Sequence, residues 1–175
     1  GTSTVNGTLQ LNNGGSVDLQ NTAVLAYGAS STLRYNNGTS IAAGNEWPAT
    51  ASPANVALLA AGTKVTLTSN RTVASVLTLA EGSIITSGNT LSVSSTSAGA
   101  VVRTNGYVDG NLQRAVAAGA STVAFPIGDA SNYTPVSLAF AAGNTAGNVT
   151  IRTDVPGVPP AAGPVPTGSA ISQTK

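Results

Sequence analysis

The sequence has no histidine, no cysteine and no methionine. Histidine is the side chain whose unperturbed pKa lies nearest neutrality, and cysteine is the strongest ordinary nucleophile, so the commonest general base and thiol chemistry are both excluded. Nearly every transition-metal site also depends on these residues. We therefore expect no enzyme activity, no catalytic residues, no metal site and no cofactor.

Charge is scarce as well. The 7 Lys+Arg and 6 Asp+Glu residues make up 7% of the 175 residues, whereas soluble domains carry about 25%. The basic residues are scattered between Arg34 and Lys175, and nucleic-acid binding needs them clustered. No apolar run approaches the roughly 18 residues of a membrane-spanning helix. We therefore expect no nucleic-acid partner and no membrane span.

Acidic side chains offer the one catalytic device that needs neither histidine nor cysteine, which is a pair of carboxylates. The six acids are Asp18, Glu46, Glu81, Asp109, Asp129 and Asp154. None is near another in the sequence, so a polysaccharide-cleaving enzyme is only the third hypothesis. A calcium site built on Asp129, Asn132 and backbone carbonyls is conceivable, but the repeated acidic motifs of calcium loops are absent.

Short apolar pairs dominate the sequence from Gly1 to Gly38. The two members of a pair are separated by one residue, which places both side chains on one face of a strand. Each pair starts eight residues after the previous one: Leu9/Leu11, Val17/Leu19, Leu25/Tyr27 and Leu33/Tyr35. Turn-forming residues such as Asn12-Asn13-Gly14 separate them. The even step predicts either a β-solenoid wall or a tight β-meander, and no helical period competes with it.

The same outline returns further along the chain. The segment 72–82 repeats threonine, valine, two leucines and glycine of the segment 4–14 at equivalent positions, which suggests a duplicated turn or sheet segment. Further pairs at Val56/Leu58, Val65/Leu67 and Leu91/Val93 extend the strands to about residue 95. The stretch from Gly44 to Pro53 interrupts the pattern with two prolines and the only tryptophan, and we interpret it as a long loop or a capping excursion.

From Ala98 the apolar pairs are spaced less evenly. This spacing is typical of a β-sandwich layer or of an irregular cap of the solenoid. We therefore predict an all-β protein with a β-solenoid or β-helix-like part over residues 1–97 and a β-sandwich-like part over residues 98–154. Residues 155–175 hold five prolines within 156–166, which favours an extended linker or tail.

Exposed aromatic rings are the best candidates for ligand contact, because their faces pack on the apolar faces of sugar rings. We take Trp47, Tyr107 and Tyr133 as possible glycan contacts. Tyr27 and Tyr35 fall in the inward register of the eight-residue step, where a core role is the stronger interpretation.

Four segments resemble a known family. They are Gly44-Asn45-Glu46-Trp47-Pro48; Thr72-Val73 to Leu79 with Gly88-Asn89-Thr90-Leu91; Tyr107-Val108-Asp109-Gly110-Asn111-Leu112-Gln113-Arg114; and Phe125-Pro126-Ile127-Gly128 with Tyr133-Thr134-Pro135-Val136. In this order they resemble repeat modules of large secreted Bacteroidetes surface proteins, over about residues 40–154. The resemblance implies export by the type IX route and an adhesin-like context, and it implies no catalytic residues. It also suggests a segment of a larger product, since no C-terminal sorting domain is present.

Together these observations predict a non-catalytic extracellular or cell-surface structural protein. It would serve as a stalk, an adhesin module or a filament subunit that self-associates, or joins adjacent modules of a longer chain, through strand and repeat contacts. The alternative is a glycan-binding module, with a surface glycan as partner.

Overall fold

The structure of the protein is a computed structural model that describes residues 1–20 and 23–153. Strands make up 51% and helix 2%, so the all-β prediction is confirmed. One short 3-10 helix, η1 (Ala98–Ala100), precedes β11. The strands are β1 (Thr2–Val5), β2 (Thr8–Asn12), β3 (Val24–Tyr27), β4 (Thr32–Asn36), β5 (Ser40–Ala42), β6 (Asn55–Leu58), β7 (Lys64–Thr66), β8 (Arg71–Val73), β9 (Val76–Leu79), β10 (Ser83–Val93), β11 (Val101–Arg103), β12 (Tyr107–Val116), β13 (Ser121–Phe125), β14 (Ile127–Gly128), β15 (Val136–Phe140) and β16 (Gly147–Ile151).

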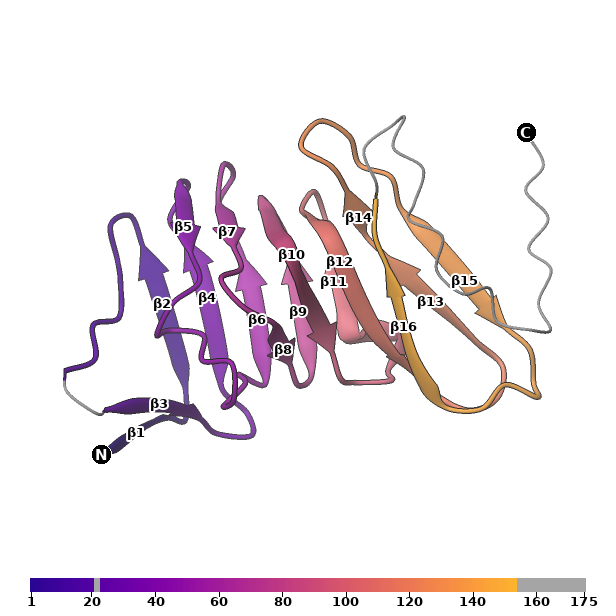
Figure 1. Ribbon diagram of the computed structural model, residues 1–175, viewed down its shortest axis with the longest axis horizontal. Helices are drawn as coiled ribbons and strands as arrows, with labels where there is room; N and C mark the ends of the chain where they lie inside the picture. The colour runs from indigo at the N-terminus through magenta and orange to yellow at the C-terminus, as the bar shows by residue number, and fades with distance from the viewer. Residues whose placement is uncertain (21–22, 154–175) are drawn as a thin grey trace.

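Five strands form the first wall of a β-solenoid of about six turns. Their order is β11-β9-β6-β4-β2, and every neighbouring pair is parallel. Leu9 pairs with Leu33, which lies three eight-residue steps further along the sequence, and Leu33 pairs with Val56. A full turn is therefore about three of these steps, and each step corresponds to one side of the turn. The strands lie side by side along the long axis in Figure 1.

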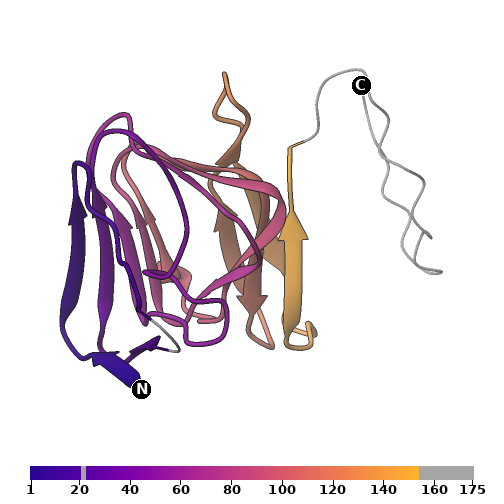
Figure 2. The same cartoon turned by 60° about the vertical axis from the view of Figure 1, so that its left-hand side comes forward.

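A second wall follows the first wall around a corner from β4 onward. Its order is β14-β12-β10-β7-β5, again with parallel neighbours. The third wall contains β1 paired with β3, and further along it β8 paired with the second half of β10. Figure 2 shows the walls wrapping around a common axis.

The long strands β10 and β12 each turn a corner between the second and third walls. Their pairing register shifts between Ile85 and Thr90. Gly110 has φ 107°, and a Cβ added there would lie 2.1 Å from Thr86 Oγ1. The Thr86 hydroxyl instead accepts a hydrogen bond of 3.0 Å from the N–H of Asn111. Glycine is therefore required where the two corners stack.

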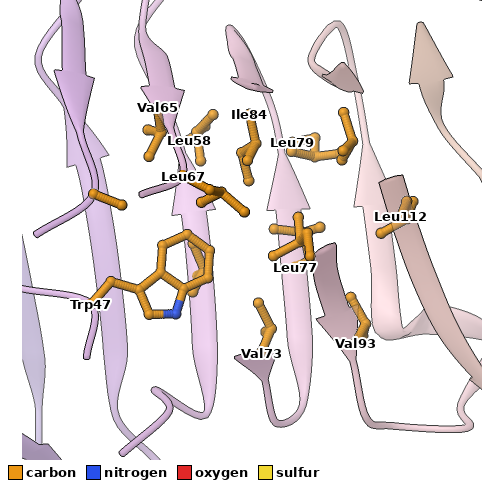
Figure 3. Packing of buried hydrophobic residues seen from close by; sticks show 14 of the residues in the cluster. Trp47, Leu58, Val65, Leu67, Val73, Leu77, Leu79, Ile84, Val93 and Leu112 are labelled. Carbon is orange, nitrogen blue, oxygen red and sulfur yellow. The ribbon is translucent and has the colours of Figure 1, made fainter. Parts of the chain in front are cut away.

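The core consists of apolar columns that run from turn to turn. Leu33, Val56 and Leu77 form one column of the first wall, with each side chain fully buried. Because parallel in-register strands place equivalent side chains about 4.8 Å apart, each apolar pair packs on the pair of the next turn. Figure 3 shows Leu77 of this column among other buried side chains, such as Leu79 and Ile84, between the walls.

The likeness between segments 4–14 and 72–82 has a direct structural basis. Leu9 of β2 and Leu77 of β9 lie in the same column, three turns apart, through Leu33 and Val56. The strands expected around Val56, Val65 and Leu91 are present as β6, β7 and the end of β10.

One expected strand is absent. Val17 and Leu19 lie in a segment without regular structure that follows β2 of the first turn. Val17 nevertheless packs against the core, which explains its apolar character. Apolar alternation therefore marks an inward-facing segment here, but no neighbouring strand of the described chain provides it with ladder hydrogen bonds.

The solenoid continues beyond residue 97, the boundary that the uneven spacing predicts. β11 pairs with β9, and β12 with β10, in the same parallel registers as earlier turns, and β14 adds to β12. Antiparallel pairing of named strands appears only near the end of the described chain, between β13 and β15 and between β12 and β16. These pairs do not confirm a separate β-sandwich, and the predicted linker at 155–175 lies outside the described residues.

Candidate functional groove at the last turns

Trp47 lies in the core and not on the surface. Its side chain is fully buried, its ring centroid lies 6.3 Å from that of Tyr35, and its Nε1–H donates to the carbonyl of Thr72 over 3.1 Å. Figure 3 shows the indole ring among the stacked aliphatic side chains. The prediction that Trp47 contacts a glycan therefore does not hold, because neither face of the ring is open to a ligand.

The loop that carries Trp47 is fixed by Glu46. The buried carboxylate of Glu46 accepts hydrogen bonds from the hydroxyl of Tyr35 at 2.8 Å and from the N–H of Gly44 at 2.9 Å. The hydroxyl of Tyr27 donates to the carbonyl oxygen of Glu46. Burial, and then the charge of Glu46, raises the pKa of Tyr35 well above its usual range. Both tyrosines therefore remain protonated donors.

Arg71 ties the same loop to the segment after β7. Its guanidinium donates to the carbonyl of Ala43 and the hydroxyl of Thr68, each over 3.2 Å, and to the hydroxyl of Ser69. A hollow of about 450 Å³ lies beside it, and Arg71 is the one charged residue among those described that line it. Both terminal nitrogens of Arg71 are already bonded to protein oxygens, so the arrangement is a structural clamp.

Tyr107 and Tyr133 come together near the end of the solenoid. Their ring centroids are 6.2 Å apart at an interplanar angle of 48°. The guanidinium carbon of Arg103 lies 3.6 Å from the centroid of the Tyr133 ring, within the range of a cation–π interaction. Gly128 makes room for the stack, because a Cβ there would lie 2.8 Å from the Tyr107 ring. Two of the three predicted contacts are thus neighbours, with Tyr133 38% exposed.

A groove of about 220 Å³ opens beside this stack, between β11 and the hairpin of β13 and β15. Its lining is mostly apolar, and Arg103 is the only charged member among the described residues: Val101, Arg103, Ala124, Phe125, Pro126, Tyr133, Pro135, Val136 and Ser137. Arg103 occupies the column position of Tyr35, Leu58 and Leu79 in earlier turns. The apolar column therefore ends in a cation at the groove.

Arg114 of β12 connects β13 to the segment before η1. It is buried, and its guanidinium donates to the carbonyl of Ala124 at 2.8 Å and to that of Ser97 at 3.1 Å. Its Nε has no hydrogen-bond partner among the described residues. Burial alone lowers the pKa of Arg114, and no carboxylate contributes to the shift.

Asp109 and Asp129 are two acids that the fold brings close. Asp109 pairs in register with Gly128, the residue before Asp129. Burial and then the charge of Asp129 raise the pKa of Asp109. Asp129 accepts hydrogen bonds from the N–H groups of Ser131 and Asn132, which lower its pKa. Asp129 is thus engaged in its own turn. The described residues contain no group of three or more acidic side chains that could hold a metal ion.

No protein-family model, no curated protein and no solved structure matches the chain. Among the residues that the structure describes, no helix is both long enough and apolar enough to cross a membrane.

Sequence reasoning missed Arg103 and Arg114. Arg114 stands in a strand of alternating apolar residues, between Leu112 and Val116, whereas Arg103 follows two consecutive valines. For Arg114, an arginine in the inward register of an apolar alternation was the available signal, because such a residue must find buried partners.

Proposed function

We propose that the chain is a non-catalytic extracellular structural protein, a cell-surface stalk, adhesin module or filament subunit that assembles through β-strand and repeat contacts. The ladder of parallel turns, in which one edge of β2 is unpaired within the described residues, carries this proposal. Within the described residues, β2 pairs only with β4, and β5 only with β7. Exposed strand edges are templates for pairing with another chain.

The scarcity of charge supports the same function. Natural proteins protect strand edges with lysine, proline or bulges. The side chains of β2 that point outward are Thr8, Gln10 and Asn12, all exposed and uncharged. This edge therefore has no charged side chain to oppose a partner strand. The resemblance to modules of secreted Bacteroidetes surface proteins is consistent with such a role, and the extracellular location remains part of the proposal.

A proline at Gln10 tests the assembly. The N–H of Thr32 donates to the carbonyl of Gly7, so the odd-numbered residues of β2 face β4 and the N–H of Gln10 faces the open edge. Gln10→Pro removes one edge donor without breaking the ladder to β4, whereas Gln10→Ala keeps it. We expect rods in electron micrographs of the wild type and of Gln10→Ala, and single particles for Gln10→Pro. Wild-type protein that remains globular and monomeric at all concentrations would contradict the filament form.

A glycan-binding module is the alternative, and the pairing of Tyr107 with Tyr133 favours it. Trp47 has no part in it. Glycan-array binding that Tyr133→Phe retains and Tyr133→Ala abolishes would support this alternative. Hydrolysis of a polysaccharide that disappears in Asp109→Asn or Asp129→Asn would overturn both proposals.

A further inference from the structure

The groove at the last turns lies where the first wall lacks a strand. From β2 to β11, each turn adds a parallel strand to this wall. The next strand after β12 in the chain, β13, pairs with β15 and not with β11. In the described part of the chain, no strand pairs with the outer edge of β11. The groove of about 220 Å³ separates that edge from β13.

The backbone of β11 presents hydrogen-bonding groups to this groove. The N–H of Thr104 donates to the carbonyl of Leu79 over 3.0 Å, so Val102 and Thr104 face β9. Because alternate residues of a strand direct their N–H and C=O groups to opposite edges, those of Val101 and Arg103 face the groove. A strand added here would continue the ladder of the first wall.

The charge at the groove is positive and lacks an acidic partner among the described lining residues. Arg103 donates through Nε to the carbonyl of Gly106 and through Nη2 to the carbonyl of Asn105. Its Nη1 makes no hydrogen bond to any described residue. The carboxylate of Glu81 accepts a hydrogen bond from the side chain of Asn105 at 2.7 Å. A ligand that carries a carboxylate therefore complements Arg103.

The size of the groove selects the kind of ligand. Pockets for small molecules are typically about 300–1,000 Å³, and this groove is smaller. Its apolar walls can take one or two side chains of an extended segment, while the open edge of β11 offers main-chain hydrogen bonds. This combination is that of strand addition, in which the backbone gives affinity and alternate side chains give specificity.

We propose that the groove between β11 and β13 binds an extended peptide segment of a neighbouring polypeptide. The segment adds parallel to β11, with an apolar residue opposite Val101 and an acidic residue two positions later opposite Arg103. The inference rests on the proposed assembly function and specifies the strand that the module accepts. Arg103 then binds the carboxylate of this acidic residue, and Tyr133 packs against the apolar part of the same side chain.

Fluorescently labelled peptides test this register with the full chain. The first is Ser-Thr-Val-Thr-Glu-Thr-Ser, the second has lysine in place of glutamate, and the third is N-methylated at the threonine between valine and glutamate. In a parallel ladder, the N–H of that threonine would donate to the carbonyl of Val101. Fluorescence anisotropy at low salt should give a dissociation constant at least about tenfold lower for the glutamate peptide than for either of the others.

Charge reversal supplies the matched control. Arg103→Glu should bind the lysine peptide more tightly than the glutamate peptide, and Arg103→Gln should bind both equally, with circular dichroism confirming that both variants fold. The proposal is wrong if Arg103→Glu keeps the wild-type preference, if N-methylation has no effect, or if no peptide binds saturably at concentrations up to about 1 mM. Binding of neutral oligosaccharides in place of peptides, lost in Tyr133→Ala, would also overturn it. If rods form but no peptide binds, only the proposal for the groove is refuted. If a peptide binds but no rods form, only the proposed assembly is refuted.

Discussion

The guanidinium of Arg114 donates a hydrogen bond of 2.8 Å to the carbonyl of Ala124. In the preceding turns of the first wall, strand carbonyls instead accept from the N–H groups of the next strand. A second bond of Arg114 reaches Ser97, just before η1. One buried side chain thus joins β13 to the preceding turn.

Replacement of Arg114 should separate these segments. Arg114→Ala leaves two carbonyls unpaired and a cavity, and we expect a loss of about 3 kcal/mol in the free energy of unfolding. Arg114→Met also leaves these carbonyls unpaired but keeps much of the side-chain volume, so it should lose about 1–2 kcal/mol less than Arg114→Ala. Urea denaturation measures both values. Equal losses would show that the volume of the buried side chain contributes nothing to stability.

Trp47 should matter for stability and not for ligand binding. Trp47→Ala removes a fully buried side chain, and we expect a loss of about 3–5 kcal/mol. Trp47→Phe keeps a ring but loses the bond to Thr72, so it should cost less. Thermal unfolding compares both variants with Tyr133→Ala, in which the loss of an exposed ring should lower the free energy of unfolding by about 1 kcal/mol. A Trp47 variant as stable as Tyr133→Ala would contradict this assignment.

Gly110 should tolerate no side chain. Gly110→Ala imposes a positive φ on alanine and places its Cβ against the Thr86 hydroxyl, so we expect a loss of about 2 kcal/mol or more. Gly143→Ala is the matched control, because nothing lies within 4 Å of its added Cβ, and it should change stability by at most about 0.5 kcal/mol. Chemical denaturation distinguishes the two. Similar stability of both variants would mean that the stacked corners adapt readily.

Asp109 should make the fold less stable as it ionises. The pKa of Asp109 is raised in the folded chain. Its contribution to stability is therefore fully present below the pKa of the unfolded chain, about 3.9, and is lost as the pH rises through the pKa of the folded chain. Asp109→Asn should therefore raise the melting temperature at neutral pH and have less effect near pH 3. Asp129, whose pKa is lowered, contributes stability above about pH 3.9 that is lost as the pH falls. Asp129→Asn should thus lower the melting temperature at neutral pH, and melting curves between pH 3 and 8 test both signs.

The solenoid could be predicted from the sequence because its columns repeat. Leu33 and Tyr35 follow Leu9 and Leu11 with the same two-residue spacing, and the likeness of segments 4–14 and 72–82 joins Leu9 to Leu77. The assignment of strands to three walls could not be predicted, because Val17 and Leu19 show the same alternation without forming a strand. The apolar periodicity of the sequence indicates which side chains point inward. Whether a segment forms a strand depends on whether the next turn places a strand beside it.

The groove was beyond sequence reasoning for a related reason. Tyr107 and Tyr133 are identifiable as aromatic residues, but their proximity depends on Gly128 and on the turn around Asp129. The prolines around Trp47 indicate a loop without indicating whether that loop folds inward, so its burial is not readable from the sequence. Arg103 and Arg114 appear in the sequence only as two isolated charges in apolar strands.

The number of residues in a turn varies, but the rise of the turn does not. In the second wall, Ile41 pairs with Val65 and Val65 pairs with Ile84, so the second of these turns is shorter in sequence than the first. Both turns advance the axis by one strand spacing of about 4.8 Å. Insertions at the corners therefore leave the length of the molecule unchanged, and duplication of a whole turn lengthens it by a fixed increment. The length of the solenoid is thus set by the number of its turns.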